Sequence, residues 1–155
     1  MRFFNIFLML MLLQFTGNLY AAQQVSSVDV ITTIPINCKF SNVSSQIILQ
    51  ENGGDATGSF TLNCNKNFDL RISSQSLKDG ESATYVRSEN GEKIRIFVDV
   101  DFIGRNVSLN SSQHIQVLDP SSSESGTINI RLASPINSTI PAGLYQDVLH
   151  LDVTF

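Results

Sequence analysis

Residues 94–102 read Ile-Arg-Ile-Phe-Val-Asp-Val-Asp-Phe, and every even position in this stretch is apolar. Successive side chains of a β-strand point to opposite faces of its sheet, so a strand here would place all its even positions on one buried face. Beyond residue 21, no stretch keeps the spacing of an amphipathic helix for three turns. The sequence therefore predicts an all-β protein.

The same alternation recurs on both sides of this stretch. The other predicted inward-facing residues are Ile34, Ile36, Cys38, Phe40, Phe60, Leu62, Cys64, Phe68, Leu70, Ile72, Ile115, Val117, Ile128, Ile130 and Leu132. Turn signals separate the runs, namely Asn52-Gly53-Gly54, Asp79-Gly80, Asn90-Gly91, Asp119-Pro120 and Pro141-Ala142-Gly143. About seven strands at such spacing predict one domain built as a sandwich of two sheets.

Composition excludes several classes of function. The chain has 155 residues with 10 Lys and Arg against 14 Asp and Glu, a net charge of -4, which argues against a nucleic-acid partner. With two Cys and two His, a zinc site of several His or Cys ligands is excluded on count. We therefore predict no cofactor and no metal.

The first residues have the pattern of a secretory signal peptide. Arg2 precedes an apolar stretch, residues 3–13, and small residues follow at Ala21 and Ala22. This stretch is shorter than the about 20 residues of a membrane-spanning helix, which is the alternative reading. We expect residues 1–21 to be removed and the protein to be exported.

Export would place Cys38 and Cys64 where thiols are oxidised, so we expect them to pair. Closing this loop would stabilise the fold by about 3.5 kcal/mol in the chain-entropy model. A reactive thiol is the alternative, but neither cysteine has CxxC spacing or a nearby His.

The start of the exported chain has an unusually long alternating run. Its even positions point one way for thirteen residues, from Val28 to Phe40, which is about 43 Å when extended. A folded domain of this size has a radius of gyration of about 14 Å, so a single strand would run past its edge. Residues 24–33 are therefore a candidate for a strand that leaves its own domain. The alternative is a bend near Pro35 that returns both halves to one sandwich.

The other end alternates as well. Residues 143–155 read Gly-Leu-Tyr-Gln-Asp-Val-Leu-His-Leu-Asp-Val-Thr-Phe. A strand here would carry Tyr145, Leu149, Leu151, Val153 and Phe155 on one face, with Asp147 as its polar member.

Together these features resemble bacterial chaperone-usher pilins of the spore coat protein U-like, or archaic, branch. The resemblance rests on the extension before Cys38, the run Gly-Ser-Phe-Thr-Leu-Asn-Cys at 58–64, and the closing Gly143-x-Tyr145-x-Asp147. The middle of the chain is also similar, through Tyr85-Val86-Arg87, Gly91 and the apolar strand that reaches Asp99.

The resemblance implies an incomplete immunoglobulin-like β-sandwich, residues 34–155, that lacks its final strand. Residues 22–33 would be a donor-strand extension, with Val28, Val30, Thr32 and Ile34 as the inserting side chains. The C-terminal strand (Tyr145, Asp147, Leu149, Leu151, Val153, Phe155) would bind a periplasmic chaperone. An outer-membrane usher and neighbouring subunits complete the implied partners of a fimbrial subunit at the bacterial surface, serving adhesion or biofilm formation.

Two other classes of function are open. One is a self-complete secreted binding module or tip adhesin. The other is a small hydrolase built on His114 or His150, or on Asp99 and Asp101 as an acid and base pair. No nucleophile with a positioned base appears in the sequence, so we predict that the protein is not an enzyme. Glycosylation sequons occur at Asn42, Asn106, Asn110 and Asn137, but they do not favour any of these functional classes over the others.

Overall fold

A computed structural model describes residues 26–120 and 123–155. The predicted signal peptide, residues 1–21, lies outside these residues. By its internal contacts the chain divides into two units, residues 1–33 and residues 34–155. No helix within the described residues is long and apolar enough to cross a membrane.

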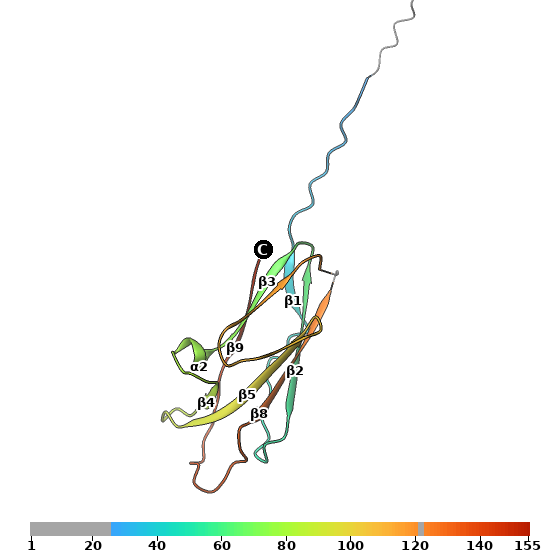
Figure 1. Ribbon diagram of the computed structural model, residues 1–155. Coiled ribbons are helices and arrows are strands. Elements are labelled where there is room, and N and C mark those ends of the chain that lie inside the picture. The colour runs from blue at the N-terminus through green and yellow to red at the C-terminus, as the bar shows by residue number, and fades with distance from the viewer. Residues whose placement is uncertain (1–25, 121–122) are drawn as a thin grey trace, which may run out of the picture. The chain divides into compact units, whose positions relative to one another are not determined.

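The larger sheet of the second unit is antiparallel and contains the strand that the alternation at 94–102 predicts. Its strand order is β1 (Cys38–Ser41), β2 (Ala56–Cys64), β8 (Glu124–Leu132), β5 (Lys93–Phe102) and β4 (Tyr85–Arg87), with β6 (Arg105–Ser108) paired to β5. The inward residues of β5, such as Val98, Val100 and Phe102, are fully or almost fully buried. Figure 1 shows β2, β8 and β5 side by side along the molecule.

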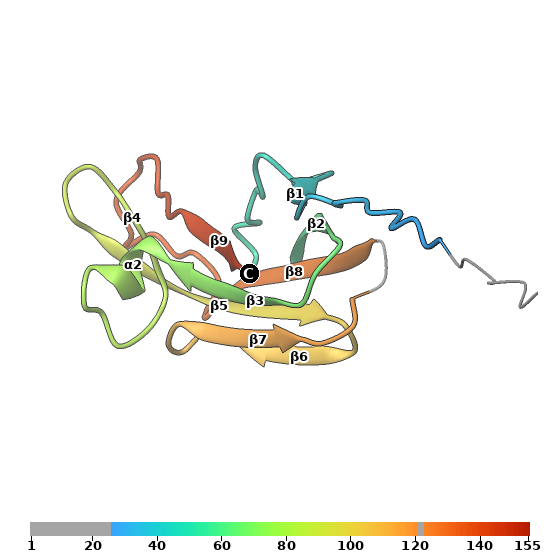
Figure 2. The ribbon, with the colours of Figure 1, turned by 90° about the horizontal axis from the view of Figure 1, so that it is seen from above.

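The smaller sheet packs on the first and has β3 in its centre. Its order is β7 (Gln113–Val117), β3 (Phe68–Ser74) and β9 (Leu149–Thr154). A single helical turn, α2 (Gln75–Lys78), follows β3 directly. Figure 2 shows β3 between β9 and β7, with α2 at its end.

Aromatic side chains join the two sheets in the core. The Phe60 and Phe102 rings of the larger sheet lie 5.3 Å apart between centroids, and Phe68 of the smaller sheet lies 6.4 Å from Phe102. The aliphatic residues predicted to point inward on β2, β3, β5, β7 and β8 are almost all buried. The predicted all-β sandwich is therefore confirmed.

The first strand begins later than the alternation predicts. β1 starts at Cys38, and Ile34 and Ile36, which were expected inside, are exposed. The cause is local. Pro35 has no N–H to donate to a neighbouring strand, and the Asn65 side chain forms hydrogen bonds with the backbone on both sides of Ile36. Its amide donates to the Pro35 carbonyl at 2.9 Å and its oxygen accepts from the Asn37 N–H at 2.9 Å.

A disulfide joins Cys38 and Cys64. The two residues lie directly opposite each other where β1 pairs with β2. The bridge therefore ties the short edge strand β1 to its only partner among the described strands.

Candidate strand-accepting groove

One edge of β9 has no strand beside it within the described residues. β9 pairs with β3 through six residues, from Leu149 to Thr154, and no other described strand pairs with it. The backbone groups along its second edge are therefore free to pair with another extended segment.

The inward side chains of β9 are much less covered than those of its neighbour. On β3, Leu70 and Ile72 are fully buried. On β9, Leu149, Leu151 and Val153 pack against the same core but remain half-buried. Because the two strands share a sheet and a face, the difference comes from missing cover beside β9.

Next to β9 lies a groove with a volume of about 860 Å³, which we call the acceptor groove. Its floor is the inner face of the larger sheet, and its floor residues are Val86, Ile94, Ile96, Ile128, Ile130 and Leu132. Four large aliphatic residues that line the groove are exposed, namely Val43, Ile48, Leu144 and Val148. Contiguous exposed apolar surface of this kind marks a binding site or an aggregation hazard.

Residues 43–51 form one rim of the groove. The Ser44 N–H donates to the Ser59 carbonyl at 2.8 Å, and the Ser59 N–H donates back to the Ser44 hydroxyl at 2.9 Å. Ile47 then lies over Gly58, where a Cβ atom would stand 2.4 Å from the Ile47 methyl. Because Gly58 has no side chain, Ile47 and the rest of this rim can pack closely against β2.

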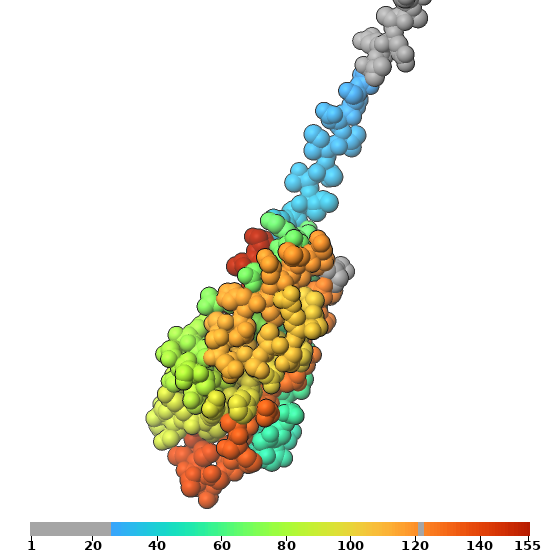
Figure 3. All heavy atoms as spheres, viewed as in Figure 1, coloured from blue at the N-terminus to red at the C-terminus, as the bar shows by residue number. Residues whose placement is uncertain are grey.

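The lower end of the groove is closed by two connecting segments. The Ile136 N–H donates to the Glu51 carbonyl at 2.8 Å, and a Cβ atom at Gly53 would stand 3.6 Å from the Pro135 ring. Figure 3 shows residues near 50 (teal) and near 140 (red-orange) next to each other at this end of the surface.

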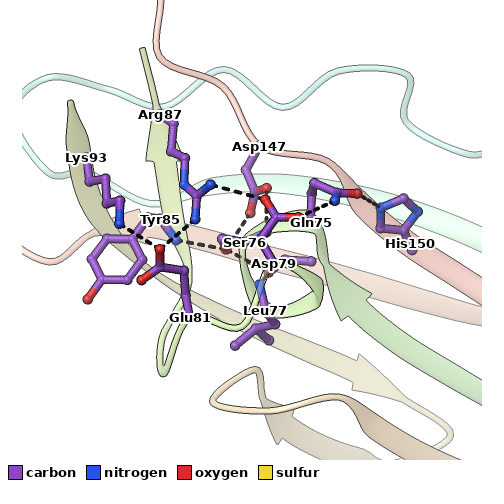
Figure 4. Close-up of polar contacts among 11 residues, drawn as sticks. Gln75, Ser76, Leu77, Asp79, Glu81, Tyr85, Arg87, Lys93, Asp147 and His150 are labelled. Carbon is purple, nitrogen blue, oxygen red and sulfur yellow. Dashed lines mark hydrogen bonds and ion pairs between the residues drawn. The ribbon is translucent and has the colours of Figure 1, made fainter. Parts of the chain in front are cut away.

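The opposite rim is residues 145–148, held by hydrogen bonds to α2 and β4, and Figure 4 shows those between Asp147 and Ser76 of α2. Asp147 accepts from the Ser76 N–H at 3.2 Å and from the Ser76 hydroxyl at 3.1 Å. Gln146 exchanges backbone hydrogen bonds with Arg87 at 2.9 and 3.0 Å. These contacts fix the segment that leads into β9.

Ion pairs surround the same rim on its outer side. Arg87 reaches Asp79 at 3.1 Å and Glu81 at 2.7 Å, and Lys93 reaches Glu81 at 2.6 Å. The hydrogen bond from Lys93 lowers the pKa of the Glu81 carboxyl, and the charges of Lys93 and Arg87 lower it further. All four side chains of these pairs remain partly exposed to solvent, so the pairs add little stability.

The predicted C-terminal strand is shorter than its alternating sequence. Only residues 149–154 form a strand, because Gln146 bonds to β4 and the Val148 carbonyl accepts from the Gln75 N–H at 2.8 Å. Leu149, Leu151 and Val153 lie on β9 as expected. Tyr145 and Asp147 precede it on the rim, and Phe155 follows it, exposed.

The predicted donor residues form no strand of their own. Val28, Val30, Thr32 and Ile34 lie in a segment without secondary structure, and all four are exposed, Val30 at 94%. Their role as donors stays a prediction.

Sequence reasoning missed the rim at Ile47, Ile48 and Leu49. These residues are consecutive and apolar between polar neighbours, without a period of two. An apolar run that fits neither face of a strand was the available signal.

The other candidate groups do not assemble. His114 lies 3.7 Å from Asp69 on an exposed surface, and the His150 ring contacts Gln75 at 3.0 Å. Asp99 and Asp101 bond to Ser108 and to Asn106 and Asn129 on the outer face of the larger sheet. Within the described residues, no group of three His, Cys, Asp or Glu side chains could hold a metal ion.

Neither a family model nor a curated protein matches the sequence. Solved structures do match. A chain of the CsuC-CsuE chaperone-tip adhesion subunit pre-assembly complex, from archaic chaperone-usher Csu pili of Acinetobacter baumannii, has a TM-score of 0.50 and 17% identity over 79% of this chain and 40% of that one. A chain of the chaperone-tip adhesin complex of CFA/I fimbriae biogenesis has a TM-score of 0.46 and 12% identity, over 76% of this chain and 42% of that one. The P pilus rod subunit PapA has a TM-score of 0.41 and 16% identity, over 78% of this chain and 99% of PapA.

The likeness to the Csu complex concerns the fold. It confirms that the predicted resemblance to chaperone-usher pilus proteins holds for the architecture of the chain. The chain spans about two fifths of the length of the first two matched chains. Assignment to the spore coat protein U-like branch stays a prediction.

Proposed function

We propose that this protein is a structural subunit of a chaperone-usher surface fimbria, which polymerises by donor-strand complementation and serves adhesion or biofilm formation. The observation that carries the proposal is the acceptor groove beside the unpaired edge of β9. A groove of that form has a backbone edge for hydrogen bonding and an apolar floor for alternate side chains, and these are the two requirements of strand addition.

The donor would be residues 22–33 of a neighbouring subunit, continued by Ile34. Val28, Val30 and Ile34 are exposed aliphatic residues at even positions, so one face of an extended segment would present them all. Their burial would contribute about 5–9 kcal/mol, an upper estimate because a free segment is already partly covered.

Before assembly the groove would need protection, because an open apolar groove beside a free strand edge promotes aggregation. A periplasmic chaperone would supply that cover along β9, with Tyr145, Asp147, Leu149, Leu151, Val153 and Phe155 as its C-terminal binding strand. An outer-membrane usher would then exchange the chaperone for the next subunit. Such a subunit would be exported through the periplasm to the cell surface after removal of residues 1–21.

Deletion of residues 22–33 tests the proposal. The shortened subunit, produced with its chaperone, should remain bound to that chaperone and should not form fibres. A matched pair of substitutions refines the test: Val30→Ser should reduce polymerisation, whereas Ile31→Ser, at an equally exposed odd position, should leave it almost unchanged. Electron microscopy and denaturant-resistant ladders on gels measure both effects.

Normal fibres from the deletion variant would reject the proposal. A stable monomer made in the absence of any chaperone would favour the self-complete binding module or tip adhesin instead.

A further inference from the structure

The outer face of the larger sheet carries a divided pattern of charge. On β5 the outward side chains run Arg95, Phe97, Asp99 and Asp101, while the inward ones between them are buried. On β8, Arg131 lies directly opposite Phe97. Along the strands, one half of this face is therefore basic and the other half acidic. We call it the charged face.

The basic half gathers two guanidinium groups at one ring. The guanidinium carbons of Arg95 and Arg131 lie 5.5 and 4.7 Å from the Phe97 ring centroid. Both side chains are exposed, and among the described residues neither has a carboxylate within ion-pair distance. The ring holds both cations by cation–π attraction, but their positive charge is not neutralised.

The acidic half is fixed by neutral donors. Asp101 accepts from the Asn106 amide at 2.7 Å and from the Asn129 amide at 3.1 Å, and Asp99 accepts from the Ser108 hydroxyl. Within the described part of the chain, no cation lies within ion-pair distance of either carboxylate. Amides and a hydroxyl orient these groups without cancelling their charge.

We propose that the charged face binds the same face of a second copy of this chain. A twofold axis in the plane of contact, perpendicular to β5 and level with Val98, reverses the direction of the strand. By register, Arg95 of one copy then lies over Asp101 of the other, and Phe97 lies over Asp99. Arg131 lies over Asn129, one step from Asp99. The Arg95–Asp101 pair brings opposite charges together and occurs twice by symmetry, as in an isologous contact, while Arg131 of each copy lies one strand away from Asp99 of the other.

A second copy fits this face better than an anionic polymer does. The face carries both signs in comparable amounts, so the carboxylates of its acidic half would repel a polyanion. The chain as a whole has a net charge of -4. A partner that matches both halves must itself have one basic half and one acidic half, and the charged face of a second copy has both.

The contact is small. Strands of nine or ten residues on β2, β8 and β5 form a face of about 400 Å² per copy, against about 800 Å² per partner in a standard interface. We expect weak, salt-sensitive self-association of the monomer, and this expectation does not depend on the proposed function. The consequence for fibres does rest on the proposed function. A fibre would repeat the charged face along its length, so many weak contacts would join neighbouring fibres side by side.

Charge exchange tests the inference on the full chain. Sedimentation equilibrium would compare the wild type with Arg95→Asp, Asp101→Arg and the double variant, in about 10 mM salt, where the screening length is about 30 Å, and in about 1 M salt, where it is about 3 Å. Each single reversal should weaken self-association at least about fivefold, because it replaces two attractions by two repulsions. The double variant should recover the wild-type affinity. Arg71→Asp, an equal change of charge at an exposed position of β3 in the smaller sheet, should have no effect.

A wild type that stays monomeric in low salt, or a double variant as weak as the single ones, would overturn the inference. Association that persists in high salt and ignores both reversals would belong to the apolar groove; it would overturn this inference and leave the proposed function standing. Retention on immobilised heparin that Arg95→Asp abolishes, without self-association, would identify a polyanion as the occupant and also overturn it.

Discussion

Gly126 leaves the space that the central aromatic ring of the core occupies. It lies on β8 opposite Phe60 of β2 and, on its other side, opposite Phe102 of β5. A Cβ atom at Gly126 would stand 2.3 Å from the Phe60 ring. That ring is fully buried and packs against Phe102, so it has no free space to move into. The requirement for glycine here is therefore steric.

We expect Gly126→Ala to lower the free energy of unfolding by about 1–3 kcal/mol, the usual cost of inserting a methyl group into a packed core. Urea denaturation of the purified subunit, or of its complex with the chaperone, measures the change. Gly143→Ala is the control, because its Cβ would approach no atom closer than 4.0 Å. Equal effects from the two substitutions would contradict the steric argument.

At this scale the sequence predicts which way a side chain points better than how well it is covered. Alternation correctly places Leu70, Ile72 and Val100 inside, where they are fully buried. It places Leu149 and Leu151 inside equally well, yet both stay half-buried. Alternation with a period of two shows which face of the sheet a side chain occupies. How deeply that side chain is buried depends on which strands pack against it, and this depends on the long-range register of the strands.

At the scale of elements, the strands missed are the short ones. β4 has three residues and β6 has four, too few for alternation to be seen. The long runs behind β2, β5 and β8 were predicted because nine or ten residues repeat the pattern several times. The predicted C-terminal strand begins late, at Leu149, for a different reason. The backbone of residues 146–148 forms hydrogen bonds with α2 and β4 instead.

β1 depends on a covalent tie more than on its four-residue ladder. Replacing Cys38 and Cys64 by Ala should lower the free energy of unfolding by about 3.5 kcal/mol, because the loop between them is no longer closed in the unfolded chain. Denaturation curves with and without reductant measure the effect, and hydrogen exchange should show β1 opening first. Reductant should destabilise the wild type and leave the double-alanine variant unchanged. A wild type indifferent to reductant would contradict the prediction.

At the scale of the whole molecule, the sequence contains both halves of the proposed contact but not their relation. The even-numbered aliphatic residues before Pro35 and the alternating C-terminal run are visible in the amino-acid order. The acceptor groove itself is not, because its floor comes from β4, β5 and β8, and its rims come from residues 43–51 and 145–148. Segments that are far apart in the sequence build the site, and only their packing brings them together.

If the groove accepts the N-terminal segment of another copy, the same segment should complete the domain when attached to it. We expect a chain carrying residues 24–36 after Phe155, through a short Asn-Gly turn, to form a hairpin with β9 and fill the groove. Its free energy of unfolding should rise, by at most about 5–9 kcal/mol, because Val28, Val30 and Ile34 become buried. Thermal unfolding of the monomer measures the gain. An attached segment with serine at those three positions should give little of it, whereas serine at Asp29, Ile31 and Thr33 should preserve most of it, since these side chains would face solvent. A gain of the same size from both altered segments would mean that the added chain does not enter the groove as an alternating strand.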